Sequence, residues 1–194
     1  KASAGIVISA SHNAYSDNGV KFFGSDGEKI SDHDELAIEA KIEEKLVTVH
    51  SNSLGKASRI DTAAEMYMEF CKSTVKNNSN LHGVRLALDC ANGATYHLAP
   101  KIFEELGAEI ISLGINPDGF NINRDVGSTS LSALVQTVKK NDVDMGIAFD
   151  GDGDRVLFVD NEGDVVDGDQ LLYLLALQKQ RSDGIEGVVG TEMS

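Results

Sequence analysis

The alternation of short apolar runs with amphipathic stretches between residues 85 and 150 constrains the fold of this chain most strongly. Apolar runs at 86–88, 110–113 and 145–149 predict buried strands, and helices are predicted between them over 94–106 and 130–140. Parallel strands need a crossover connection, and helices supply it. The sequence therefore predicts an α/β fold with mixed, mostly parallel sheets and helices on both faces.

The segments on either side of this region predict further elements. The sequence predicts a buried strand at 6–8 and a second strand at 20–23, which ends in a turn at Asp26-Gly27. A helix is then predicted to start at a capping box of Ser31 and Asp34. Residues 47–60 lack periodicity and predict a linker. A helix beginning at Asp61 is then expected to bury one face formed by Ala64, Tyr67, Phe70 and Cys71. A hairpin over 155–166, a helix over 168–180 and a strand at 187–190 are predicted to follow the central region.

Composition excludes several classes of protein. The chain of 194 residues is 41% apolar and 25% charged, which is typical of a globular protein, and its net charge of -14 argues against nucleic acid as a partner. Its apolar runs are too short to cross a membrane. Two cysteines without metal-binding spacing, and no signal peptide, predict a cytoplasmic location. Both chain ends are interpreted as cuts within a longer protein.

An acidic loop, Asp150-Gly151-Asp152-Gly153-Asp154-Arg155, directly follows the predicted strand at 145–149. Carboxylates that converge without a cation repel one another, by roughly 4 kcal/mol for two unit charges ~4 Å apart at an effective dielectric near 20. A hard divalent cation removes that cost, and oxygen ligands suit Mg²⁺ or Ca²⁺. The glycines allow the tight turns that aim alternate aspartates inward. The loop therefore predicts a metal site.

Other interpretations of the acidic loop are weaker. One alternative is a solvent-exposed acidic turn that binds no metal. An EF-hand loop requires Gly at its sixth position and Glu at its twelfth, where this chain has Arg155 and Asn161. An aspartyl-phosphate phosphatase of the haloacid dehalogenase type would use Asp150 and Asp152, but Asp154 and Arg155 do not continue its pattern.

A second polar loop carries Ser9-Ala10-Ser11-His12-Asn13 and is followed by Lys21. A serine hydroxyl is a poor nucleophile without an adjacent base, a metal or prior phosphorylation. Taken alone, this segment is a common surface sequence. No Walker A or Gly-x-Gly-x-x-Gly motif is present, so a nucleotide phosphate donor is not expected.

Together the two loops resemble the phosphoserine and metal loops of the α-D-phosphohexomutases. The resemblance extends to the segments 89–94, 121–123, 146–149 and 166–170, which are most similar to the members that act on glucosamine phosphates. Those enzymes usually have proline where this chain has Ala14, and its absence is expected to loosen the serine loop.

The resemblance implies an organisation into four domains, of which this chain is a fragment. Residues 1–56 would form the C-terminal part of the first domain, with the phosphoserine loop. Residues 57–163 would form the second domain, with the metal loop, and residues 164–194 would begin the third. The loops that bind the sugar and its distal phosphate in that family would lie outside this chain, so the fragment alone is expected to be inactive.

The resemblance also implies roles for individual residues. Ser11 would be the phosphorylated nucleophile, with His12 beside it, and Lys21 would be a general acid or base. Asp150, Asp152 and Asp154 would bind one Mg²⁺ per chain together with phosphoserine 11. Arg155 would contact the substrate, and Arg155 and the metal would favour loss of the proton of Lys21.

The implied reaction interconverts glucosamine 6-phosphate and glucosamine 1-phosphate, toward UDP-N-acetylglucosamine synthesis. It would pass through a phosphoserine enzyme and a sugar bisphosphate, with a sugar 1,6-bisphosphate as primer. The full-length protein is a candidate homodimer. Two alternatives stay open: a mutase for glucose or mannose phosphates, and a non-catalytic module that binds metal and phosphosugar.

Overall fold

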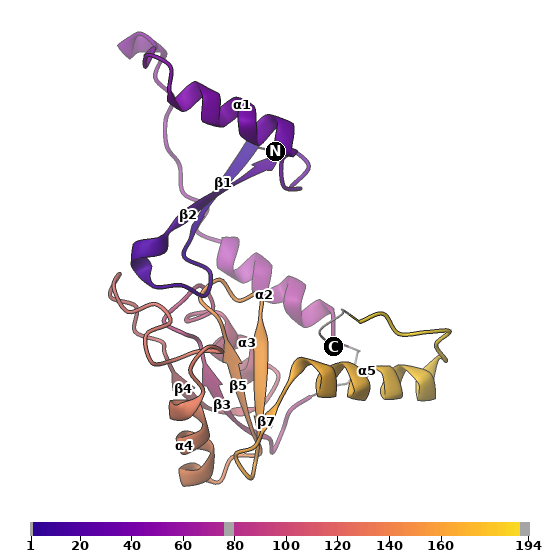
Figure 1. Ribbon diagram of the computed structural model, residues 1–194. Coiled ribbons are helices and arrows are strands. Elements are labelled where there is room, and N and C mark those ends of the chain that lie inside the picture. Colours follow the sequence, from indigo (N-terminus) through magenta and orange to yellow (C-terminus); the bar gives the residue numbers. More distant parts are fainter. Residues whose placement is uncertain (1, 76–79, 191–194) are drawn as a thin grey trace.

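The computed structural model describes residues 2–75 and 80–190, which form two separate sheets joined by a long connection (Figure 1). The first sheet is a hairpin, and the second has five strands. In chain order the elements are β1 (Ala4–Ser9), β2 (Gly19–Gly24), α1 (Asp32–Ile42), α2 (Ala63–Ser73), β3 (Arg85–Asp89), α3 (Ala99–Glu105), β4 (Glu109–Leu113), α4 (Ser132–Asn141), β5 (Met145–Phe149), β6 (Val156–Asp160), β7 (Val165–Val166) and α5 (Gly168–Ser182).

The five-stranded sheet has the order β4-β3-β5-β6-β7. Strand β3 pairs in parallel with β4 on one side and with β5 on the other, whereas β6 and β7 add an antiparallel hairpin beside β5. This confirms the predicted α/β fold with a mixed sheet. Strands β3 and β5 lie inside the sheet, so the loops that follow them leave from its middle.

The core lies on both faces of this sheet, because alternate residues of a strand point to opposite sides. Ala87 and Ala148 point toward α4, where Leu134 and Val138 are fully or almost fully buried. On the other face, Leu86, Leu88 and Ile147 pack with residues that include Phe103 of α3. Helices therefore cover both faces, as the sequence predicts.

Helix α3 is shorter than its predicted range of 94–106. Residues 94–98 form turns, and the helix begins at Ala99, with Pro100 in its first turn. The turns belong to the connection after β3, where Ala94 N donates to the carbonyl of Gly151, so these residues contact the acidic loop. The helix ends before Gly107, whose φ of 101° is the left-handed conformation that glycine permits.

Helix α2 begins later than predicted, and of the four residues predicted to face inward only Ala64 and Cys71 are partly buried. Its N-cap is Thr62 rather than Asp61, and no side chain caps it. Met68 is buried, whereas Tyr67 and Phe70 are more than half exposed. The helix packs against α3 and is joined to it by the ion pair of Lys72 with Glu105. The inward stripe is therefore rotated away from the two aromatic residues.

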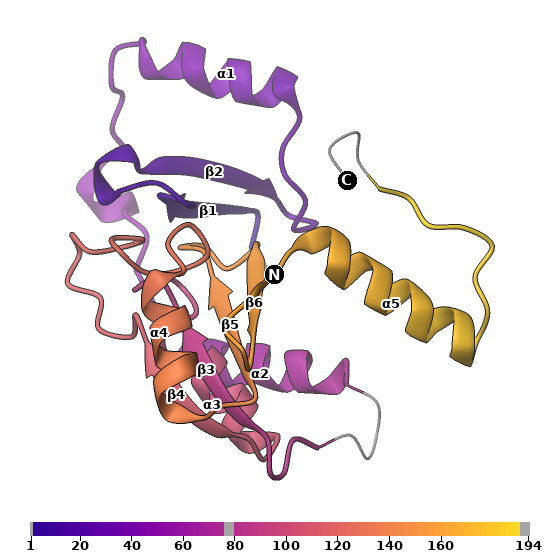
Figure 2. The same ribbon diagram turned by 60° about the horizontal axis from the view of Figure 1, so that its bottom comes forward.

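The hairpin β1–β2 has the predicted strands but not the predicted burial. Ile6 and Ile8 are 63% and 73% exposed. The strands pair from Ala4 with Gly24 to Ser9 with Gly19, and no third strand joins them within the described residues. Helix α1 lies on the side of the hairpin away from the large sheet (Figures 1 and 2). A two-stranded ribbon has little interior, so apolar side chains that predict a buried strand remain at its surface.

The connection and the C-terminal region complete the fold. Residues 47–60 contain no helix or strand except a 3-10 turn at Ser51–Ser53, as expected for a linker. Strand β7 carries the large sheet past residue 163 to Val166, and α5 then starts at a capping box formed by Asp167 and Gln170. The strand predicted at 187–190 is absent, since these residues have no regular structure. Among the described residues, no helix has the length and apolar character needed to span a membrane.

Candidate functional site

The acidic loop begins at the carboxyl end of β5, in the middle of the large sheet. Asp150 is completely buried there. One carboxylate oxygen accepts hydrogen bonds from the backbone N–H groups of Gly153 and Arg155 at 3.2 and 3.0 Å, and the other accepts from Nε of Arg155 at 3.1 Å. These contacts fold the loop back on itself and offset the cost of burying the charge.

The three aspartates of the loop converge, as predicted. Asp150, Asp152 and Asp154 each offer a carboxylate oxygen, and these oxygens lie within 4.8 Å of one another. The Oδ1 atom of Asp152 is buried and has no hydrogen-bond partner among residues 2–75 and 80–190. A buried carboxylate oxygen without a donor is costly, and a cation would satisfy it. The donor set consists only of oxygen atoms and fits a hard divalent cation.

The electrostatics of the cluster reflect crowding of like charges. Burial and the neighbouring charges of Asp152 and Asp150 raise the pKa of Asp154. Burial also acts to raise the pKa of Asp152, but the hydrogen bond and charge of Lys21 outweigh it, and the net pKa is lowered. Asp152 is therefore stabilised by Lys21 from the hairpin, as Asp150 is by Arg155 from its own loop.

Lys21, on β2, supplies that cation. Its Nζ atom lies 2.9 Å from Oδ2 of Asp152. The hydrogen bond and charge of Asp152 raise the pKa of Lys21, with smaller contributions of the same sign from Asp154 and Asp150. The prediction that Arg155 and the metal together favour loss of the Lys21 proton is not tested by the chain without metal. Arg155 pairs with Asp150, so carboxylates dominate around Lys21 and hold its proton.

The serine loop connects β1 to β2 and faces the acidic loop. Ser11 has φ of 51°, an uncommon conformation for a residue with a side chain. Its N–H donates to Oγ of Ser9 at 2.9 Å, and its own Oγ lies 3.4 Å from Nδ1 of His12. Oγ of Ser9 also donates to Asp152 at 3.3 Å. The loop is thus bonded both within itself and to the carboxylate cluster.

The structure brings the serine loop and Lys21 to the acidic loop, although the side chain of His12 contacts only Ser11 among these residues. Lys21 and Ser9 reach Asp152, and the backbone of Ser11 approaches Gly151 so closely that a Cβ at Gly151 would overlap the carbonyl oxygen of Ser11. Arg155 is half exposed beside Asp150, with its Nε atom 3.9 Å from Asp154. An open cavity of about 380 Å³ lies where the two sheets meet, lined in part by Ser9, Asn92 and Asp152.

Two positioning residues were missed by the sequence analysis. The amide of Asn123 donates to the carbonyl oxygens of Ser11 and Asn13, both at 2.8 Å. Asp89, fully buried at the end of β3, accepts from the N–H groups of Ala91 and Gly127 at 3.0 and 2.7 Å, and burial raises its pKa. The available signal for Asp89 was an acidic residue at the end of a buried strand, and for Asn123 a short asparagine-rich loop.

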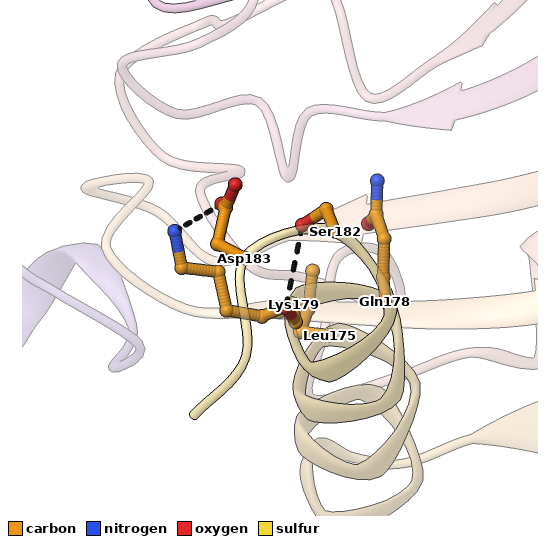
Figure 3. A pocket seen from close by; sticks show the side chains of 5 residues that line it. All are labelled: Leu175, Gln178, Lys179, Ser182 and Asp183. Carbon is orange, nitrogen blue, oxygen red and sulfur yellow. Dashed lines mark hydrogen bonds and ion pairs between the residues drawn. The ribbon is translucent and has the colours of Figure 1, made fainter. Parts of the chain in front are cut away.

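Another hollow of the molecule contains none of these residues. It lies beside the C-terminal turns of α5, has a volume of about 340 Å³, and is lined by Leu175, Gln178, Lys179, Ser182 and Asp183 (Figure 3). Lys179 and Asp183 form an ion pair at 2.6 Å, and Ser182 donates to the carbonyl of Lys179. These contacts are local to the end of the helix, so we place the candidate site at the serine and acidic loops.

Comparison with known families agrees with this geometry. The family model for phosphoglucomutase/phosphomannomutase alpha/beta/alpha domain I matches residues 1–47, and the model for domain II of the same family matches residues 65–163. The two loops fall in the two matched segments. The chain belongs to the phosphoglucomutase/phosphomannomutase family, which confirms the resemblance to the phosphohexomutases.

Individual relatives refine the comparison. The chain is 56% identical to phosphoglucosamine mutase of Psychromonas ingrahamii and 57% identical to that of Marinobacter nauticus, in each case over all of this chain and 44% of the relative. It also resembles the crystal structure of a putative phosphomannomutase from Thermus thermophilus, with a TM-score of 0.76 and 25% identity over 94% of this chain and 42% of that one. The chain thus spans less than half the length of these relatives.

Replacing Asp152 by asparagine tests the metal site. We expect the Kd for Mg²⁺ to rise at least about tenfold, or ~1.4 kcal/mol, because the neutral amide is a poorer ligand. Isothermal titration calorimetry with Mg²⁺ measures this. Asp164→Asn is the control, since it removes the same charge at an exposed position outside the cluster. Equal affinity of the Asp152→Asn and wild-type proteins would show that the cluster does not bind the metal.

The conformation of Ser11 predicts a difference between two substitutions that both remove its hydroxyl. The free energy of unfolding of Ser11→Gly, measured by urea denaturation, should exceed that of Ser11→Ala by about 1 kcal/mol. A Cβ is strained at this φ, whereas glycine adopts it freely. The control pair is Ser16→Gly and Ser16→Ala, in the 3-10 turn Tyr15–Asp17 of the same loop, where alanine should be the more stable. The same order at both positions would contradict the strain at Ser11.

Proposed function

We propose that this chain carries the phosphoryl-transfer centre of a phosphosugar mutase that interconverts glucosamine 6-phosphate and glucosamine 1-phosphate. The observation that carries the proposal is the meeting of the serine loop with a cluster of three carboxylates. Lys21, on the serine side, pairs with Asp152, and Asn123, on the acidic side, bonds the backbone of Ser11. A hydroxyl and a cation-binding cluster held at one place are what phosphoryl transfer requires.

Ser11 is the phosphoryl carrier in this proposal. Phosphoserine 11 gives its phosphoryl group to a hydroxyl of the sugar phosphate: a P–O bond to the sugar forms, the bond to Oγ breaks, and a sugar bisphosphate results. The bisphosphate reorients in the site, and its other phosphoryl group is transferred to Oγ of Ser11. Phosphate is neither gained nor lost, so the dephosphorylated enzyme needs a sugar 1,6-bisphosphate as primer.

Asp150, Asp152 and Asp154, together with phosphoserine 11, would hold one Mg²⁺. A phosphoserine carries about -1.5 to -2 charges near neutral pH, which adds to the three carboxylates. When bound, the metal offsets this charge and stabilises the charge that develops on the transferred oxygens. The Oδ1 atom of Asp152 supports the assignment, because it is a buried carboxylate oxygen, and so a potential metal ligand, that no donor among the described residues satisfies.

Proton transfer is assigned to Lys21, and orientation to its neighbours. Lys21 is partly exposed and close to the cluster, so it can give a proton to the departing oxygen and take one from the attacking hydroxyl. Its raised pKa in the chain without metal makes the protonated form the resting state. His12 lies beside Oγ of Ser11 and would orient it, and the exposed side of Arg155 would contact the substrate.

The choice of sugar rests on the relatives. Identity of 56–57% to two phosphoglucosamine mutases over the whole of this chain supports an amino sugar phosphate. Glucose or mannose phosphate is the second candidate, supported by the likeness to a putative phosphomannomutase. Competition among the three sugar phosphates, measured as relative kcat/KM on the full-length protein, decides between them.

In the full-length protein that contains this chain, Ser11→Ala should reduce mutase turnover to background. The alanine variant has no oxygen at position 11 to receive phosphate, although the hydroxyl of Ser9, which donates to Asp152, is left intact. A coupled assay of glucosamine 1-phosphate formation, with Mg²⁺ and a bisphosphate primer, measures it. Ser16→Ala serves as the control and should keep wild-type turnover. Near-wild-type rates for Ser11→Ala would refute the mechanism.

The segment 1–194 on its own should show negligible turnover even when folded. Its sequence offers a phosphoryl carrier and a metal loop but no recognisable loop for the distal phosphate of the sugar. Orientation can supply about 7–11 kcal/mol in a well-positioned reaction, and each 1.36 kcal/mol lost is about tenfold in rate. The same coupled assay, with the segment and the full-length protein at equal concentration, checks this. Comparable rates would show that these residues suffice.

A further inference from the structure

We propose that Asn123 is a positioning residue that fastens the serine loop to the large sheet and so holds Ser11 at the carboxylate cluster. This inference rests on the proposed function, because it concerns the same site. Asn123 touches neither the hydroxyl of Ser11 nor any of the three aspartates through a hydrogen bond. It bonds the backbone on either side of His12, at Ser11 and Asn13.

The geometry of the contact is that of a clamp. Both bonds come from one atom, Nδ2 of Asn123, which carries two N–H donors and directs them to two carbonyl oxygens at 2.8 Å. The carbonyls belong to a hairpin loop more than a hundred residues away in the sequence. Two bonds to alternate residues fix the path of the loop between them, whereas a single bond would leave it free to rotate.

Asn123 is itself held in place by the large sheet. Its φ of 57° is a left-handed conformation, which asparagine tolerates better than most residues. Its N–H donates to the carbonyl of Ala91, in the turn after β3, at 2.8 Å. A few residues further on, Ala94 N bonds the carbonyl of Gly151 in the acidic loop. The clamp therefore ties the serine loop to the same turn that supports the metal cluster.

The clamp differs from the ionic contact between the hairpin and the acidic loop. Lys21 binds Asp152, which is one of the metal-binding carboxylates, so that ion pair shares its acceptor with a cation. The acceptors of Asn123 are backbone carbonyls, which neither titrate nor bind the proposed metal. These hydrogen bonds therefore do not compete with a metal ion for their acceptors. A residue in a sparsely populated conformation, such as Ser11, keeps it only where the surroundings enforce it, and Asn123 provides that constraint.

The test compares Asn123→Gly with Asp125→Gly in the full-length protein. Asp125 has φ of 58°, is exposed and lies in the same loop, so glycine makes an equivalent backbone change without removing a clamp. The N–H groups of Ser11 and Asn13 report on the serine loop, because they bond Oγ of Ser9 and the carbonyl of Ala10. Their hydrogen exchange is measured by mass spectrometry on dephosphorylated protein in EDTA, which excludes effects of metal and substrate.

We expect exchange over residues 10–14 to become about tenfold faster or more in Asn123→Gly and to stay unchanged in Asp125→Gly. In the mutase assay, Asn123→Gly should lower kcat about tenfold or more while KM changes less than about twofold, because a misplaced phosphoryl group affects the reaction and not sugar binding. Asn123→Asp should be at least as impaired, since it sets a carboxylate oxygen against two carbonyl oxygens.

Unchanged exchange in Asn123→Gly, or equal acceleration in both glycine variants, would overturn the inference. A rise in KM at constant kcat would overturn it as well, because it would place Asn123 in sugar binding. The exchange measurement needs no turnover, so it remains decisive if the wild-type protein has no mutase activity. Absence of mutase activity in the wild-type protein would refute the proposed function. The exchange data alone would then decide whether Asn123 is a clamp.

Discussion

The structure depends on the convergence of three carboxylates at the end of β5. Two unit charges ~4 Å apart repel by roughly 4 kcal/mol at an effective dielectric near 20, so each carboxylate must be offset. Asp150 is offset by two backbone N–H groups and Arg155, and Asp152 by Lys21 and Ser9. The partners of Asp152 come from the hairpin, so the charge of the acidic loop also attracts the segment that carries Ser11.

The large sheet makes this convergence possible, and the apolar runs that form its central strands can be recognised in the sequence. Leu86, Ala87 and Leu88 are apolar at every position because β3 has a helix on each face, and β5 is similar. Strands buried on both faces cannot shift without exposing side chains, so their ends are fixed and the loops after them have defined origins. The origin of the acidic loop at the end of β5 and the convergence of its three carboxylates were therefore predictable.

What the sequence does not reveal depends on contacts between distant segments. Residues 94–98 have helical periodicity, but Ala94 N bonds the carbonyl of Gly151 in the acidic loop, and the rest of the segment forms local turns instead of a helix. Tyr67 and Phe70 are apolar and face outward, because α3 sets which side of α2 is covered. Asn123 lies in a polar loop where asparagine is common for local turn formation. Its bonds to Ser11 and Asn13 cross between two sheets, and no periodicity encodes such a contact.

The ion pair of Lys21 with Asp152 and the hydrogen bonds of Asn123 differ in kind, and the proposed reaction gives that difference a purpose. In that reaction the charge at Ser11 would fall by about 1.5 to 2 units when phosphate arrives and rise by the same amount when it leaves, so a loop held only by ion pairs would shift with every transfer. The pair of Lys21 with Asp152 is sensitive to such changes, whereas the amide bonds of Asn123 to backbone carbonyls are not. A carrier that must receive and return phosphate at one place requires the second kind of contact. The charged contact then remains free to respond to metal and substrate.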